Sequence, residues 1–223
     1  MSAPTPPAPL RVVALVSGAG STLRALLEAI EASRGTAAAV GAELVALGSD
    51  TPRANLALAD EYGLPSFLVD PRAYPDRDAW GRALLERICE HRPELTLLSG
   101  FMRLVPSSVV RALSPRLINQ HPAYLPEFPG HRAVRDALAS GARQTGASII
   151  VVDEGVDTGP IVERVRVPIE AGDDEESLHE RIKTVEREML VRTVRGIADG
   201  SIRLDALVRD EPGGPGSEGG GTA

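Results

Sequence analysis

The stretch RVVALVSGAGSTLRALLEAIEAS, residues 11–33, decides the fold, because a loop of small residues joins an apolar strand to an amphipathic helix. After its first residue Arg11–Val16 is wholly apolar, which is typical of a strand buried on both faces of a parallel sheet. Ser21–Ser33 then carries apolar residues at helical spacing. A buried strand followed directly by such a helix favours an α/β fold.

The same alternation continues through the first half of the chain. It predicts strands at Glu43–Leu47, Ser66–Val69 and Glu94–Ser99, and helices at Arg53–Tyr62 and Arg77–His91. Right-handed crossovers between these strands give a parallel sheet with helices on both faces. Such sheets bind ligands at the carboxyl ends of their strands, near the switch in strand order. We therefore expect a site directly after Val16, Ser99 and Gln120.

The second half of the chain reads differently. It predicts helices at Ser107–Leu113, His131–Ser140 and Glu175–Ala198, and strands at Arg116–Gln120, Ala147–Val152 and Ile161–Val167. The last two strands are separated only by the turn Asp153–Pro160, which is short enough for a hairpin-like return. We therefore predict an α/β fold whose mostly parallel central sheet is mixed at its C-terminal end.

Composition indicates a single domain between two tails. The chain has 223 residues, of which 43% are hydrophobic and 3% aromatic, so Val, Leu, Ile and Ala must build the core. Residues 1–9 are rich in proline and 207–223 in glycine and proline, and little in either tail can be buried. We predict disordered tails at 1–9 and 207–223 and one domain over 10–206. Residues 1–9 also lack the features of a secretory signal.

Charge and cysteine content narrow the function classes. A formal net charge of -7 without a long basic run argues against a nucleic-acid surface or an anionic membrane as the partner, and no apolar run is long enough to span a bilayer. Cys89 is the only cysteine and falls on the apolar face of a predicted helix, which predicts a buried structural thiol. A lone cysteine forms no internal disulfide and fits a reducing cytoplasm.

The loop SGAGSTL, residues 17–23, leads into the first helix and is open to two interpretations. Its backbone N–H groups and the helix N-terminus can hold a phosphate, and a monophosphate suits it better than a dinucleotide. It equally fits a tight turn in which Ser21 caps the helix. Leu23 stands where the dinucleotide fingerprint has glycine, and no Gly-Lys-Ser/Thr of a nucleoside triphosphate loop follows.

The segment NQHPAYLPEFPG, residues 119–130, contains the most informative pair. Asn119 and His121 lie two residues apart at a strand end, so their side chains leave the same face of the sheet. An amide N–H₂ can stabilise a developing oxyanion, and an imidazole can donate to it or shuttle a proton. Without a nucleophile motif, direct acyl transfer through a tetrahedral intermediate is favoured over an acyl-enzyme. The alternative is that Asn119 caps a turn and His121 is a satisfied, half-buried histidine.

The acidic turn VDEGVDTGP, residues 152–160, follows the next strand. A carboxylate here can orient the imidazole, favour its protonated form and order a water that relays protons. Read alone, the segment fits a simple loop in which Asp and Gly form turns.

Together with SGFMRL, residues 99–104, these segments resemble the folate-dependent formyltransferases in order and spacing, over Leu10 to about Ala206. The resemblance implies a Rossmann-like three-layer fold and transfer of a formyl group from 10-formyltetrahydrofolate, as cosubstrate, to the amine of glycinamide ribonucleotide. It implies a phosphate- and nucleotide-binding N-terminal half, and a folate-binding and catalytic C-terminal half.

The resemblance also implies roles for particular residues. Asn119, His121 and Asp157 match the catalytic trio. Gly20, Ser21 and Thr22 match positions that hold the nucleotide phosphate, and Glu186 matches a contact to the glycinamide. The folate-binding positions are Arg77, Met102, Arg103, Leu104, Val105, Asn119, Asp153 and Asp157. The sequence departs from many relatives at Ala19, Thr22, Arg132 and Ile150, which affects ligand contacts and leaves the trio untouched.

Other functions stay open at this point. Methionyl-tRNA formyltransferase and formyltetrahydrofolate deformylase belong to the same family, but we expect no room here for their additional domains. A sugar-nucleotide formyltransferase, or a non-catalytic folate- or nucleotide-binding module, are further alternatives. We expect no metal, because His91, His131 and His179 lack ligand spacing. We also expect a monomer or homodimer.

Overall fold

The computed structural model describes residues 8–209, and its first strand, β1 (Leu10–Val16), supplies two separate cores. Val12, Ala14 and Val16 pack into one hydrophobic cluster, whereas Val13 and Leu15 pack into the other. Because successive side chains of a strand point to opposite faces, β1 is buried on both sides, as its apolar run predicts.

Within residues 8–209 the sheet has seven strands in the order β3-β2-β1-β4-β5-β6-β7. The remaining strands are β2 (Ala42–Ser49), β3 (Ser66–Leu68), β4 (Leu95–Leu98), β5 (Leu117–His121), β6 (Gln144–Val151) and β7 (Ile161–Pro168). Strands β1 to β5 pair in parallel, and β6 and β7 pair antiparallel. The predicted mixed sheet is therefore confirmed.

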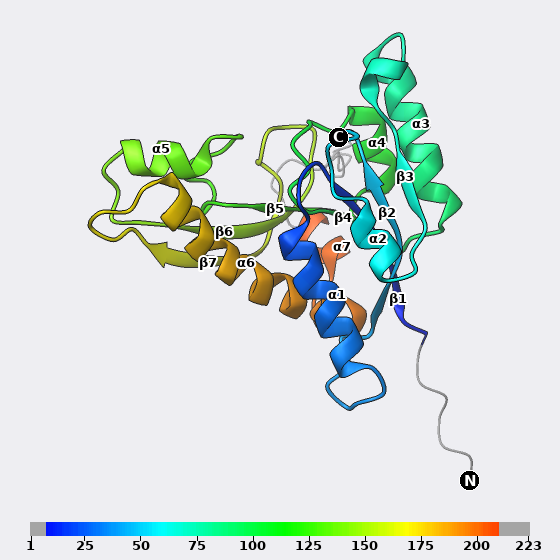
Figure 1. The fold of residues 1–223 in the computed structure, drawn as a ribbon, viewed down its shortest axis with the longest axis horizontal. Helices are drawn as coiled ribbons and strands as arrows, with labels where there is room; N and C mark the ends of the chain where they lie inside the picture. The colour runs from blue at the N-terminus through cyan, green and yellow to red at the C-terminus, as the bar shows by residue number, and fades with distance from the viewer. Residues whose placement is uncertain (1–7, 210–223) are drawn as a thin grey trace, which may run out of the picture.

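Helices cover both faces of this sheet (Figure 1). One face carries α1 (Ser21–Ser33), α2 (Ala57–Glu61), α5 (Ala133–Ala139), α6 (Glu175–Ala198) and α7 (Leu204–Arg209), whose buried residues join the same cluster. The other face carries α3 (Arg77–Glu90) and α4 (Ser107–Leu113), with Trp80 as its largest buried side chain. Helices α1 and α6 pack side by side in Figure 1.

The strand order switches direction at β1, because the chain proceeds from β1 to β2 on one side and later places β4 on the other. The loops that leave the carboxyl ends of β1 and β4 therefore diverge and open a crevice between them. In that crevice lie Gly18–Thr22 and Leu98–Val105, where the sequence predicts a site.

Three predictions about local structure were wrong. Cys89 is exposed, because it lies one position beyond the buried stripe of Leu84 and Ile88 on α3. Helix α2 begins at Ala57 rather than Arg53. The hydroxyls of Ser49 and Thr51 bond the backbone of Thr51 and Arg53 and so compete with a helix that would begin at Arg53.

The third concerns the C-terminal boundary. Residues 207–209, which we predicted to be tail, belong to α7, and the short η1 turn (Pro71–Ala73) was also not predicted. Apart from residues 8 and 9, the rest of both predicted tails lies outside the described residues. No helix within residues 8–209 combines the length and the apolarity that a membrane crossing requires.

Candidate active site

The crevice at the carboxyl ends of the strands contains a cavity of about 450 Å³. Its walls come from segments that are distant in the sequence: the glycine loop after β1, the loop after β4, the end of β5, the turn between β6 and β7, and one face of α6. The predicted site residues that line it are Gly20, Ser21, Thr22, Met102, Arg103, Leu104, Val105, Asn119, His121, Asp153, Asp157 and Glu186.

The centre of the site is the trio Asn119, His121 and Asp157. One carboxylate oxygen of Asp157 accepts a hydrogen bond from Asn119 Nδ2 at 3.4 Å, and the other lies 3.4 Å from His121 Nδ1. These contacts are at the long end of the hydrogen-bond range. A single carboxylate thus connects the amide and the imidazole.

The imidazole of His121 is buried and faces oxygen acceptors on both sides. Its Nε2 lies 2.9 Å from the carbonyl oxygen of Phe128, and its Nδ1 faces Asp157. Since a carbonyl only accepts, Nε2 carries the proton that it donates to Phe128. The ring is therefore held between the Phe128 carbonyl and the Asp157 carboxylate.

The turn after β6 has an unusual backbone that positions Asp157. Asp157 has φ 54, a left-handed conformation that Asp tolerates better than most residues, and the backbone N–H of Gly130 donates to its carboxylate at 2.8 Å. Asp153 fixes the start of the turn, because its carboxylate accepts from Gly155 N and from Thr158 Oγ1. A side chain at Gly159 is excluded, since its Cβ would lie 1.8 Å from the Val151 carbonyl oxygen.

The glycine loop reaches helix α1 without a side-chain cap. Gly20 is the N-cap residue with φ 69, and no described side chain bonds the first-turn N–H groups. Ser21 is therefore the first helical residue and not the cap that the turn-only interpretation required. Free N–H groups at a helix N-terminus, together with the helix dipole, favour an anionic ligand beside Ser21 and Thr22.

Helix α6 contributes a face of titratable side chains. Glu186 is only 7% exposed, and burial raises the pKa of its carboxyl to about 7, although Lys183 and Arg187 act in the opposite direction. His179 and Lys183 line the cavity beside it. Burial, followed by the charge of Lys183, lowers the pKa of His179.

The loop after β4 forms the outer wall. Phe101 and Val105 are buried at its ends, whereas Met102 is 73% and Leu104 51% exposed beside the cavity. Arg77 does not line this cavity. It lies with Arg103 in a neighbouring hollow of about 280 Å³ and donates to the Leu104 carbonyl oxygen at 2.7 Å.

Our sequence reasoning missed part of the site. His131, His179 and Lys183 line the cavity. A signal for two of them was present, because His179, Lys183 and Glu186 recur at helical spacing and so share one face of α6. Among residues 8–209 no group of three or more His, Cys, Asp or Glu side chains is arranged to hold a metal ion.

A mixed α/β sheet with an amide, an imidazole and a carboxylate beside an uncapped helix N-terminus is the arrangement expected of an enzyme of the formyl transferase class. The chain belongs to the formyl transferase family, which matches residues 10–194.

Within that family it groups with proteins named phosphoribosylglycinamide formyltransferase. It is 44% identical to the Mycobacterium tuberculosis protein of that name, over 86% of this chain and 87% of the relative. It is 39% identical to the trifunctional purine biosynthetic protein adenosine-3 of Drosophila pseudoobscura, over 90% of this chain and 15% of the relative. Glycinamide ribonucleotide transformylase 1 of Symbiobacterium toebii has a similar structure, with a TM-score of 0.81 and 35% identity, over 86% of this chain and 89% of that one.

Proposed function

We propose that this chain transfers the formyl group of 10-formyltetrahydrofolate to the amine of glycinamide ribonucleotide in de novo purine biosynthesis, on the route to IMP. The products are formylglycinamide ribonucleotide and tetrahydrofolate. The observation that carries the proposal is that Asn119, His121 and Asp157 converge in one cavity wall, between the glycine loop and the loop after β4. The first loop suits a phosphate and the second an extended, partly apolar ligand.

The proposed reaction begins when the substrate amine attacks the formyl carbon. A new C–N bond forms, and the formyl oxygen takes up negative charge. Asn119 Nδ2 donates to that oxygen, and His121 Nε2 donates to it after giving up its contact with the Phe128 carbonyl. Collapse of the tetrahedral intermediate breaks the bond between the formyl carbon and N10 of the folate. The attacking nitrogen loses a proton and N10 gains one. In this proposal Asp157 orients the His121 ring and orders a water that relays the proton.

The remaining walls bind the two substrates in this proposal. The first-turn N–H groups at Gly20, Ser21 and Thr22 hold the nucleotide phosphate, and Glu186 faces the glycinamide end. Met102, Leu104 and Val105 lie along the folate, with the backbone of 153–157 against its pterin. Arg103 and Arg77 lie at the outer end of the same wall. We place the activity in the cytoplasm, which a single exposed thiol at Cys89 fits.

The experiment is formyl transfer itself. Purified protein is mixed with 10-formyltetrahydrofolate, with and without glycinamide ribonucleotide, and released tetrahydrofolate is followed by absorbance. We expect release only when the nucleotide is present, and we expect His121→Ala to abolish it. Release without the nucleotide would instead indicate a deformylase. No release in either mixture would contradict the proposal and favour another acceptor or a non-catalytic binding module.

A further inference from the structure

A buried carboxylate lies directly behind the cavity wall and has no role in the mechanism above. Asp50 follows the last residue of β2, and its side chain is 4% exposed. It is not among the residues that line the cavity. A buried carboxylate in this position requires partners, because removing a charge from water is costly unless it is paired.

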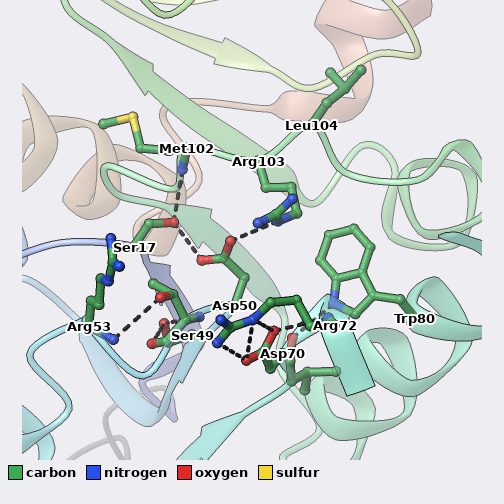
Figure 2. Close-up of polar contacts among 12 residues, drawn as sticks. Ser17, Ser49, Asp50, Arg53, Asp70, Arg72, Trp80, Met102, Arg103 and Leu104 are labelled. Atoms are coloured by element: carbon green, nitrogen blue, oxygen red, sulfur yellow. Dashed lines mark hydrogen bonds and ion pairs between the residues drawn. The ribbon is translucent and has the colours of Figure 1, made fainter. Parts of the chain in front are cut away.

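Two side chains supply those partners, Ser17 from the loop after β1 and Arg103 from the loop after β4, as Figure 2 shows. One oxygen of Asp50 accepts from Ser17 Oγ at 2.7 Å, and the other accepts from Arg103 Nε at 2.9 Å. Because Ser17 gives its proton to Asp50, its oxygen is free to accept from the backbone N–H of Met102, at 2.9 Å. Asp50 therefore holds the loop after β4 twice, directly through Arg103 and indirectly through Ser17.

The outer wall segment, Met102–Leu104, has little else to hold it in place. It belongs to no helix or strand, and all three of its residues are exposed, between the buried anchors Phe101 and Val105. Apart from the contacts of Asp50, its backbone is held by the bond from Arg77 to the Leu104 carbonyl. The Arg103 guanidinium also lies 5.9 Å from the Trp80 ring centroid. The position of this segment thus depends on a few side-chain bonds.

We propose that Asp50 is a positioning residue for the folate cosubstrate. It fixes the outer wall segment before binding, so that the segment need not be ordered when the folate enters. Ordering a loop on binding weakens affinity, and hydrogen bonds to a charged group are the strong ones. This inference rests on the proposed function, which assigns Met102–Leu104 to the folate.

Asp50→Asn is the test variant, because it keeps the shape of the side chain and removes its charge. The chain offers a close chemical match at the start of α6. Asp173 has the same 4% side-chain exposure, an arginine partner in Arg181 at 2.6 Å, and a serine partner in Ser177 at 2.9 Å. Unlike Arg103, the partner of Asp50, neither of these α6 residues lines the cavity. Asp173→Asn therefore controls for loss of a buried, paired carboxylate in itself.

Steady-state kinetics and hydrogen exchange test the inference. We expect Asp50→Asn to raise KM for 10-formyltetrahydrofolate about ten- to hundredfold, the range that loss of a charged hydrogen bond produces. We expect kcat to stay within about threefold of wild type, because the trio is untouched. In hydrogen exchange, the amides of residues 100–104 should exchange faster in Asp50→Asn than in wild type. Asp173→Asn should change neither the KM nor that exchange.

The two proposals fail separately. If the wild-type protein transfers no formyl group to glycinamide ribonucleotide, the proposed function is contradicted. In that case the role of Asp50 is still tested by comparing hydrogen exchange in wild type and Asp50→Asn. Equal KM and equal exchange in Asp50→Asn and Asp173→Asn would overturn the inference. If Asp50→Asn does not fold, Ser17→Ala replaces it, because that variant removes only the relay to Met102. It should show a smaller rise in KM and faster exchange at Met102, and no change in either would again overturn the inference.

Discussion

Replacement of Glu186 by Gln should stabilise the protein above neutral pH. Burial raises the pKa of this carboxyl from 4.5 to about 7, so the folded chain binds a proton that the unfolded chain releases between those two values. Stability therefore falls as pH rises through that window and levels off above about 7. Each unit of difference between the two pKa values is equivalent to about 1.4 kcal/mol. At pH 8 the ionised carboxylate therefore lowers the free energy of unfolding by up to about 3 kcal/mol.

Urea unfolding of wild type and Glu186→Gln at several values between pH 4 and pH 8.5 measures this cost. The two proteins should be nearly equal at pH 4, and the variant should gain up to about 3 kcal/mol at pH 8, or roughly 6–12 °C in Tm for a chain of this size. Glu188→Gln is the control, because Glu188 lies on the same helix with an exposed side chain. A difference between wild type and Glu186→Gln that does not vary with pH would refute the reasoning.

Two further substitutions test the geometry of the acidic turn. Asp157→Asn should lower kcat by roughly 10²- to 10⁴-fold and leave KM for both substrates nearly unchanged, because the carboxylate is proposed to act on proton transfer. Steady-state kinetics measure both parameters. An equal loss through KM would contradict that role. Gly159→Ala should lower the free energy of unfolding by about 1–3 kcal/mol, because its Cβ would lie 1.8 Å from the Val151 carbonyl oxygen. It should also reduce turnover, because Gly159 lies two residues after Asp157 in the same turn. An unchanged urea midpoint would mean that the turn accommodates the methyl group without strain.

Periodicity predicted the elements best where burial alone determines them. The limits of α1, α4 and α6 are those predicted from the sequence, and β1 is buried on both faces as its apolar run requires. Periodicity failed where polar side chains compete for the backbone, as Ser49 and Thr51 do before α2. It also failed at Cys89, where one residue of helical rotation separates the core from solvent.

The candidate site was predictable to the extent that its residues are neighbours in the sequence. Asn119 and His121 share a face because they are two apart on a strand, which follows from strand geometry alone. Asp157 reaches them only because the turn after β6, which begins beside the start of β5 where Val151 pairs with Ile118, folds back across β5. Sequence reasoning left that carboxylate as one of several acids in a loop, and only the family resemblance selected it.

Asp50 shows why the outer wall could not be predicted from local pattern. In the sequence it stands in Ser-Asp-Thr-Pro after a strand, which reads as an ordinary turn. Its partners are 33 and 53 residues away. They meet because β1 lies between β2 and β4, so the carboxyl ends of three parallel strands are adjacent and bring together Asp50, Ser17 and the loop that carries Arg103. A change in strand order would leave every local motif intact and separate these three side chains. The switch in strand order therefore both opens the cavity and supplies the polar contacts that hold its outer wall.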